Sequence, residues 1–333
     1  MKLSSQSCLP TTHSMIIRLD DVHSLPRGSY ITRLHKMLRG SSASIFRPHP
    51  HARLTQHLNI LKNSKFSTFS TVMSSARPIL VVAGIGNGSG TGASTARLFS
   101  KAGYRVALVA RNPEHLKKLA DEINQSGGEA VAFPIASYSY SDVIKNLQEI
   151  KQHSWPGNEK SEIRAAVWNA SFGAFKTFLD VTEEDLKRVT ETSIDAPFAF
   201  SREVILAFQE NSIDEKGRRG TLIFTGATAS IRGNVFTSAF ASGKFALRAL
   251  SQSLAKEFGK QNIHVAHAII DGGILTDLAA SRRAEGEARD SYINNEDIRL
   301  SPNSIAESYL YLTNQDRSSW TWELDLRPAH EKW

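Results

Sequence analysis

Apolar and polar positions follow two recurring patterns from residue 77 onward. Short apolar runs indicate strands buried on both faces, and about ten or more residues with helical periodicity separate them. Because strands joined by helices pair in parallel through right-handed crossovers, residues 77–333 are expected to form one doubly wound, Rossmann-type parallel α/β domain. Strands are predicted at 79–83, 105–110, 129–134, 164–169, 220–225, 263–270 and 321–325, and helices at 92–103, 113–126, 141–151, 183–209, 239–259 and 304–313.

The segment before this pattern, residues 1–76, has a different composition. It carries ten Lys and Arg but only two acids, and it is rich in Ser and His. This composition is typical of a transit peptide, and equally of a disordered tail or of upstream sequence before a later start at Met73. We therefore expect a disordered N-terminal extension and an intracellular protein, either cytoplasmic or mitochondrial.

Charge and cysteine content exclude several classes of protein. The net charge of +7 belongs to the extension, because residues 77–333 are almost balanced, and this argues against nucleic-acid binding. Cys8 is the only cysteine, so no internal disulfide can form and no metal site is expected. No apolar run approaches the roughly 18 residues of a membrane-spanning helix, so no membrane contact is expected.

A glycine-rich turn follows the first predicted strand. The run Ala83-Gly84-Ile85-Gly86-Asn87-Gly88-Ser89-Gly90-Thr91-Gly92 leads directly into a predicted helix. Glycines let the backbone approach a pyrophosphate closely, and the first amides of the helix have no partner within it. The order of strand, glycines and helix therefore predicts a dinucleotide-binding turn.

Residues 78–326 resemble the short-chain dehydrogenase/reductase superfamily in four motifs. The superfamily's G-x-x-x-G-x-G pattern matches Gly86, Gly90 and Gly92, and its Asn-Ala-Gly motif corresponds to Asn169-Ala170-Ser171. Its Tyr-x-x-x-Lys motif corresponds to the segment from Phe240 to Lys244. Its Pro-Gly turn with a following Thr corresponds to the segment from Asp271 to Thr276. The resemblance implies a nicotinamide cofactor. Its phosphates would lie at the three glycines, with Asn169 supporting the site, Lys244 holding the ribose and Thr276 contacting the carboxamide.

Cofactor preference rests on the end of the second strand. An acidic residue there would bind the ribose hydroxyls of NAD(H), but this chain has Ala110 followed by Arg111. A guanidinium binds phosphate in a planar, bidentate manner, and Ser89 lies where similar enzymes place a second phosphate contact. The sequence therefore favours NADP(H) over NAD(H), the alternative being that Arg111 is only a solvated side chain.

The catalytic pattern departs from the superfamily at three of its four positions. The superfamily's Lys is present as Lys244, but Phe240 stands at its Tyr position. Ala227 stands at its Ser position, with Thr228 beside it, and Ser193 stands at its Asn position. A phenylalanine has no proton to transfer, so Lys244, a nearby hydroxyl such as that of Thr228, or water would have to supply it. Some similar enzymes that reduce conjugated double bonds also lack the Tyr.

The leading hypothesis is an NAD(P)(H)-dependent oxidoreductase, NADPH-preferring, that transfers hydride to or from a small carbonyl or enoyl substrate. The alternative is a non-catalytic NADP(H)-binding regulatory or scaffold protein of the same fold.

The resemblance also implies a homodimer or homotetramer formed by the helices at 183–209 and 239–259, and a substrate lid within 276–302. His267 is expected to hydrogen-bond a neighbouring element, with a catalytic role as the alternative, and Asp271 to cap a turn rather than to contact substrate.

Overall fold

The seven strands of the described chain form one parallel sheet. The computed structural model describes residues 77–157 and 160–332, so the predicted extension lies outside the described residues. The sheet order is β3-β2-β1-β4-β5-β6-β7, and all neighbouring strands run parallel. The strands are β1 (Arg77–Ala83), β2 (Arg105–Ala110), β3 (Glu129–Pro134), β4 (Ser161–Trp168), β5 (Gly220–Thr225), β6 (Ile263–Ile270) and β7 (Glu323–Leu326).

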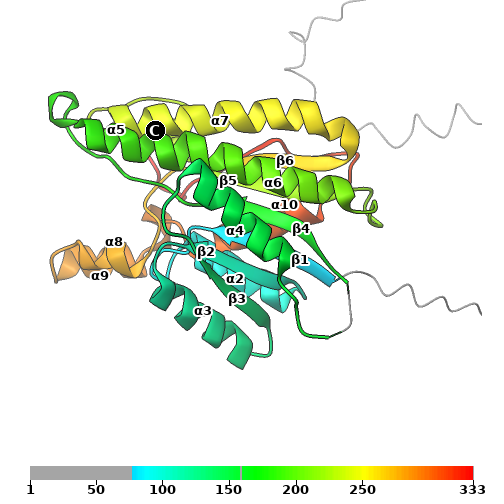
Figure 1. Cartoon of the computed structure of the whole chain (residues 1–333). Coiled ribbons are helices and arrows are strands. Elements are labelled where there is room, and N and C mark those ends of the chain that lie inside the picture. Colours follow the sequence, from blue (N-terminus) through cyan, green and yellow to red (C-terminus); the bar gives the residue numbers. More distant parts are fainter. Residues whose placement is uncertain (1–76, 158–159, 333) are drawn as a thin grey trace, which may run out of the picture. The chain divides into compact units, whose positions relative to one another are not determined.

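Helices cover both faces of this sheet, which confirms the predicted doubly wound fold (Figure 1). One face carries α2 (Thr91–Lys101), α3 (Pro113–Gln125) and α10 (Pro302–Asn314). The other carries α4 (Tyr140–Gln152), α6 (Ala196–Glu210) and α7 (Ser238–Phe258), and α5 (Glu183–Thr190) packs against α7 through Val189. Neighbouring β1 residues face opposite layers: Val81 packs in the α4–α6–α7 core, whereas Leu80 packs in the α2–α3–α10 core. This two-sided burial explains the continuous apolar runs of the strands.

The predicted helix at 183–209 consists of three consecutive helical segments. A π-helical turn, Glu191–Asp195, separates α5 from α6. Pro197 lies in the first turn of α6 and has no amide hydrogen to donate to the preceding turn, which fits an interruption of the α-helical ladder here. Apolar periodicity alone did not reveal this interruption.

The segment 276–302 contains two short helices, α8 (Asp277–Ser281) and α9 (Glu287–Asn294), that extend from the body of the molecule (Figure 1). The predicted strand at 321–325 corresponds to β7, which lies at the opposite edge of the sheet from β3. No helix within residues 77–157 or 160–332 is long and apolar enough to cross a membrane.

The strand order reverses between β1 and β4, since β2 and β3 lie on one side of this pair and β5 to β7 on the other. In open parallel sheets, the crevice beyond the carboxyl ends of the strands at such a point is where ligands bind. The turn after β1 is the glycine-rich segment. The topology therefore places the predicted dinucleotide turn at this crevice.

Candidate active site

A cavity of about 870 Å³ lies beyond the carboxyl ends of the central strands. The glycine turn, the residues after β4, β5 and β6, the first turns of α7 and the start of α8 form its walls. It brings together most of the predicted site residues: Gly86, Gly90, Gly92, Asn169, Thr228, Phe240, Lys244 and Thr276.

Close packing fixes the glycine turn. Gly84 has φ +94°, and a Cβ there would lie 2.4 Å from the Ala170 amide nitrogen. A Cβ on Gly92 would lie 2.2 Å from the Gly84 carbonyl oxygen, which already accepts a 2.6 Å hydrogen bond from the Asn169 side-chain amide. Asn169 thus ties the turn after β1 to the end of β4. Sequence reasoning missed Gly84, although its place directly after the strand was the available signal.

The N-terminus of α2 forms one side of the cavity. Gly90 is its N-cap and makes no side-chain capping bond, so the first amides of α2 have no capping side chain. The Thr91 hydroxyl lies beside them, buried and without a hydrogen-bond partner among the described residues. Unpaired amides, an unsatisfied hydroxyl and the positive end of the helix dipole form an arrangement that accepts an anionic group.

Lys244 forms the floor of the cavity. Its side chain is buried, and its ammonium group donates a 2.8 Å hydrogen bond to the Thr225 carbonyl at the end of β5. Because burial penalises the charged form, the pKa of Lys244 is lowered to about 8. The Phe240 ring lies one helical turn earlier, with its centre 5.7 Å from the Lys244 ammonium nitrogen. The cavity therefore holds a cation, but no hydroxyl, at these two positions of α7.

Thr228 and Thr276 line the cavity from different loops. Thr228 begins the short 3-10 helix η3 (Thr228–Ser230) after β5. Thr276 is the N-cap of α8, and its hydroxyl oxygen accepts a 3.0 Å hydrogen bond from the Ala279 amide. A Cβ on Gly90 would lie 3.4 Å from the Thr276 methyl carbon, so the start of α8 touches the glycine turn.

Three predicted site residues do not line this cavity. The Ser89 hydroxyl donates to the Asn87 side chain at 2.6 Å and accepts from the Asp277 amide at 3.0 Å, which joins the turn to α8. The exposed Arg111 guanidinium lies 5.2 Å from the centre of the Tyr138 ring. Ser193 is buried in the π-helical turn against Gly243 of α7.

A chain of polar groups lies behind Lys244, in which His267 is buried and Arg248 and Glu323 are half-buried. Arg248, one turn after Lys244 on α7, donates to both carboxylate oxygens of Glu323 at 2.6 and 2.8 Å. His267 of β6 also bonds Glu323, 3.0 Å from its Nδ1 atom. Since an ionised carboxylate only accepts, Nδ1 carries the proton, and the buried Nε2 lies against Gly226 without a partner among the described residues. His267 thus bonds a neighbouring strand as predicted, while burial lowers its pKa to about 4.

The prediction that Asp271 caps a turn is wrong. Its carboxylate is buried and forms an ion pair with Arg327, which follows β7. The Asp271 amide also donates to the Leu326 carbonyl at 2.9 Å. The pairing partner lies 56 positions later in the chain, where local turn chemistry gives no signal.

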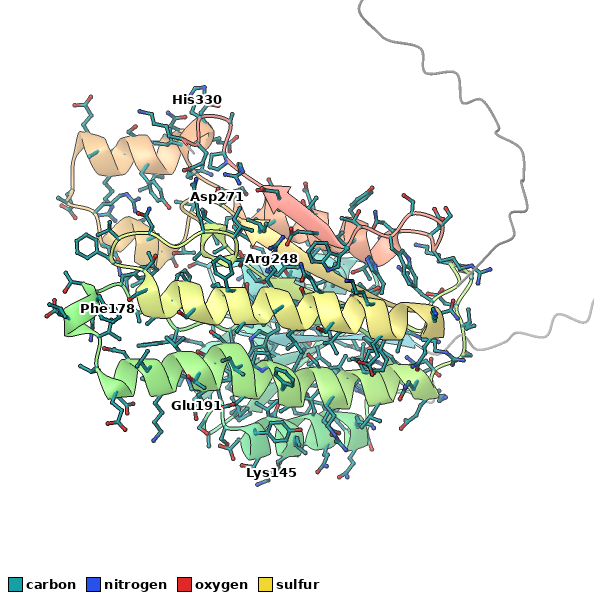
Figure 2. The ribbon with its side chains drawn as sticks, turned by 90° about the horizontal axis from the view of Figure 1, so that it is seen from above. Lys145, Phe178, Glu191, Arg248, Asp271 and His330 are labelled. Carbon is teal, nitrogen blue, oxygen red and sulfur yellow. The ribbon has the colours of Figure 1, made fainter. Side chains whose placement is uncertain are left out.

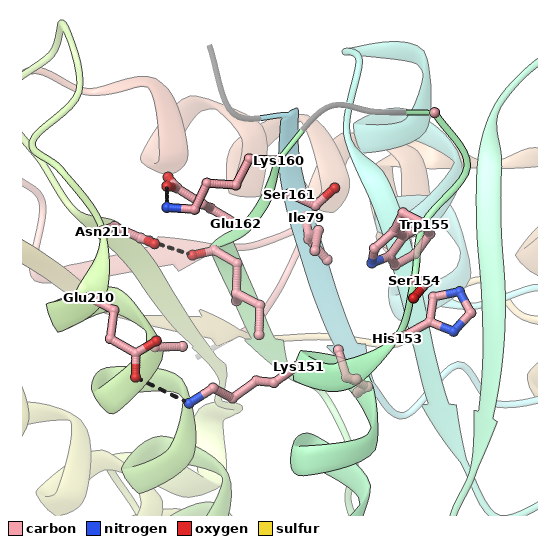
Figure 3. Close-up of a pocket in the computed structure, with 14 residues that line it drawn as sticks. Ile79, Lys151, His153, Ser154, Trp155, Lys160, Ser161, Glu162, Glu210 and Asn211 are labelled. Carbon is pink, nitrogen blue, oxygen red and sulfur yellow. Dashed lines mark hydrogen bonds and ion pairs between the residues drawn. The ribbon is translucent and has the colours of Figure 1, made fainter. Parts of the chain in front are cut away.

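A second cavity, of about 480 Å³, lies at the amino ends of β1 and β4 (Figure 3). Its walls include Trp155, an ion pair between Lys151 and Glu210 at 3.5 Å, and Asn211, which donates to the Ile163 carbonyl at 2.8 Å. None of the predicted site residues lines it. This cavity at the amino ends of the strands therefore holds none of the predicted site chemistry.

Comparisons with known proteins agree with this geometry. An uncharacterized oxidoreductase, YxnA of Bacillus subtilis (strain 168), is 28% identical over 228 residues, which span 68% of this chain and 60% of that relative. The 3-oxoacyl-[acyl-carrier-protein] reductase of Mus musculus is 28% identical over 205 residues, 62% of this chain and 80% of the mouse protein. The match to YxnA thus covers less than two thirds of that relative.

Solved structures of other proteins have the same fold as residues 77–332 of this chain. A short-chain dehydrogenase from Rhodopseudomonas palustris is 30% identical and superposes with a TM-score of 0.59 over 75% of this chain and 98% of the other. An alcohol dehydrogenase from the archaeon Thermococcus sibiricus has a TM-score of 0.63 over 77% of this chain and 98% of the other, at 21% identity. The sequence profile of the short chain dehydrogenase family matches residues 80–287. The chain therefore belongs to the short-chain dehydrogenase family.

Proposed function

We propose that this protein is an NADP(H)-dependent oxidoreductase that transfers a hydride to or from a carbonyl or conjugated enoyl substrate. The observation that carries the proposal is the placement of the α2 N-terminus and the buried Lys244 in one cavity. Related proteins support it, since they include the oxidoreductase and the acyl-carrier-protein reductase above. The Thermococcus structure is described as complexed with 5-hydroxy-NADP, and a metagenomic relative as a complex with NADP.

The residues present fit a dinucleotide. Gly90, Gly92 and the unsatisfied Thr91 hydroxyl offer amides and a donor to the pyrophosphate. Lys244, a point charge at the base of the cavity, would hold the ribose hydroxyls next to the reacting ring. Thr276 lies against Gly90 and would contact the carboxamide.

Reduction of a ketone requires two transfers. A nicotinamide bound in the cavity would supply the hydride for the carbonyl carbon, and a group of the site or water would have to give a proton to the carbonyl oxygen. A positioned proton donor contributes about 10²–10⁴-fold to the rate. Lys244 lies beside Phe240 and is a buried ammonium group that lines the cavity, and its lowered pKa of about 8 brings it near the operating range of a donor. Thr228 would orient the substrate oxygen.

The proposed preference for NADP(H) rests on Arg111 and the absence of an acid after β2. Arg111 follows the carboxyl end of β2, on the side of the crevice where the adenosine half of a dinucleotide lies. Its contact with Tyr138 leaves the guanidinium exposed and able to meet a 2′-phosphate. The Ser89 hydroxyl has one proton, so it can donate to the same phosphate only by giving up its hydrogen bond to Asn87.

Calorimetric titration of the full chain with NADPH and then NADH tests this proposal. We expect NADPH to bind at least about tenfold more tightly, about 1.4 kcal/mol, and Arg111→Ala to remove most of that difference. Arg317→Ala, an exposed arginine outside the cavity, is the matched control and should change neither affinity. Failure of both nucleotides to bind the wild-type chain would refute the function.

One observation favours a second candidate, an NADP(H)-binding protein without turnover: Phe240 offers no hydroxyl beside Lys244. We expect Phe240→Tyr to raise ketone reduction by about 10²–10⁴-fold if the site lacks only its acid. The measurement is NADPH oxidation with ketones, with enoyl thioesters assayed in parallel. If neither the wild-type chain nor the variant turns over any of them while NADPH still binds, the non-catalytic candidate is favoured.

A further inference from the structure

Two loops at the mouth of the cavity expose large apolar side chains. The loop between β4 and α5 presents Phe175, Phe178 and Leu179, which are 60%, 76% and 92% exposed. The loop between β5 and α7 presents Val235 and Phe236, which are 72% and 54% exposed. We call these five residues the apolar rim. Contiguous exposed apolar surface of this kind marks a binding surface rather than an ordinary solvated loop.

The two loops touch each other and continue into the cavity. The Lys176 amide donates a 3.0 Å hydrogen bond to the Phe236 carbonyl, which joins the two halves of the rim. Phe175 lines the cavity itself, and the centre of its ring lies 4.9 Å from that of Phe240. Figure 2 places Phe178 at the end of the molecule where α7 begins. The rim is therefore an outward extension of the apolar wall beside Lys244.

Phe236 occupies a backbone conformation that its side chain disfavours. It has φ +65° in a turn closed by a 3.2 Å hydrogen bond from the Thr237 amide to the Asn234 carbonyl. Glycine or asparagine is usual at such a position, because a bulky side chain there is strained. Since the Phe236 ring is largely exposed, packing in the fold does not explain it. Strain of this kind collects at functional sites.

We infer that the substrate carries an extended apolar portion, such as an acyl or other hydrocarbon chain, that leaves the cavity at Phe175 and lies along the apolar rim. This inference rests on the proposed function, because it places the reacting carbonyl or enoyl group near Lys244. Continuity of the rim with the cavity wall favours the substrate over a second protein as the occupant. A small polar substrate would fill the cavity and leave the rim in water.

A homologous series of ligands tests this inference. The full chain loaded with NADP⁺ is titrated calorimetrically with 2-alkanols of four to ten carbons, and NADPH oxidation is measured with the matching 2-alkanones. We expect affinity and kcat/KM to rise about two- to fourfold for each added methylene. The upper value corresponds to about 0.8 kcal/mol for a fully buried methylene.

Phe236→Asn removes the ring but keeps a residue that tolerates positive φ, so the variant should fold with an unchanged or higher Tm. We expect its dependence on chain length to become clearly flatter, so that the loss of affinity relative to wild type grows from four to ten carbons. Tyr311→Asn is the matched control, since Tyr311 is 60% exposed on α10 and does not line the cavity. It should leave the dependence on chain length unchanged.

The inference is overturned if wild-type affinity does not depend on chain length, or if Phe236→Asn retains the full dependence. An oligomer that Phe236→Asn dissociates, or flotation with phosphatidylcholine vesicles that this variant loses, would assign the rim to a subunit contact or to a membrane surface instead. Absence of NADP(H) binding would refute the proposed function separately. In that case the 2-alkanol titration of the free chain still decides whether the rim binds hydrocarbon.

Discussion

At the residue scale, the proposed chemistry of this protein converges on Lys244. The pattern Phe-x-x-x-Lys was visible in the sequence, but the environment of the lysine was not. Its bond to the Thr225 carbonyl and its burial, which lowers its pKa to about 8, follow from how α7 packs over the end of β5. A buried ammonium group whose pKa lies near 8 can give up a proton far more readily than a solvated lysine.

A pH profile of the reaction tests the role of Lys244. The group is protonated below its pKa of about 8, so kcat/KM for reduction should be constant there and fall tenfold per pH unit above it. Lys244→Met should lose about 10²–10⁴-fold in kcat/KM and lack this alkaline limb. Glu257→Gln, an exposed change near the end of the same helix, is the control. An unchanged limb in Lys244→Met would show that another group gives the proton.

At the scale of elements, the glycine turn is held by contacts between strands rather than by its own sequence. The motif predicted a tight approach to a ligand at Gly86, Gly90 and Gly92. The structure adds that Gly92 is pressed against the Gly84 carbonyl, which Asn169 of the neighbouring strand end also contacts. Gly84 and Gly92 thus serve packing between β1, α2 and β4, besides the access to a phosphate that we propose for the turn.

Gly92→Ala should therefore destabilise the protein. A Cβ 2.2 Å from the Gly84 carbonyl forces the strand end and α2 apart, and overpacking of this kind costs about 1–3 kcal/mol. The same change at Gly259 is the control, because nothing lies within 4 Å of its Cβ position and its φ is −56°. Urea unfolding measures both: Gly259→Ala should be neutral or up to about 1 kcal/mol more stable. Equal effects at the two sites would contradict the packing argument.

At the scale of the whole molecule, α5 with α6 and α7 lie side by side on the outside of one sheet face (Figure 2). This face exposes Leu186, Phe198 and Phe245, which are 50%, 52% and 43% exposed. Apolar side chains in this number on one helical layer are typical of a surface that a partner covers. The homodimer or homotetramer expected from the sequence resemblance stays a prediction, and this face is where we expect the contact.

Phe198→Asp should break that contact. Burying a carboxylate in an apolar interface is strongly unfavourable, so the variant should sediment as a monomer while its far-ultraviolet circular dichroism stays native. Tyr311→Asp, on the opposite face of the sheet, should retain the wild-type mass. A wild-type chain that sediments as a monomer at micromolar concentration would contradict the prediction.

The sequence by itself determined the local features of this protein: the approximate ranges of the seven strands and of the helices that cover the sheet, the parallel α/β class, the glycine turn and the Phe240–Lys244 pair. It did not reveal the π-helical turn at Glu191–Asp195 or the short helices α8 and α9. Apolar periodicity and glycine placement are local properties, so they can be seen without the fold. Only the tertiary structure decided which distant groups meet, such as Arg248, Glu323 and His267 behind Lys244, Asp271 with Arg327, and the two loops of the apolar rim. These contacts depend on which strands become neighbours in the sheet, and crossover packing sets that order independently of the local pattern.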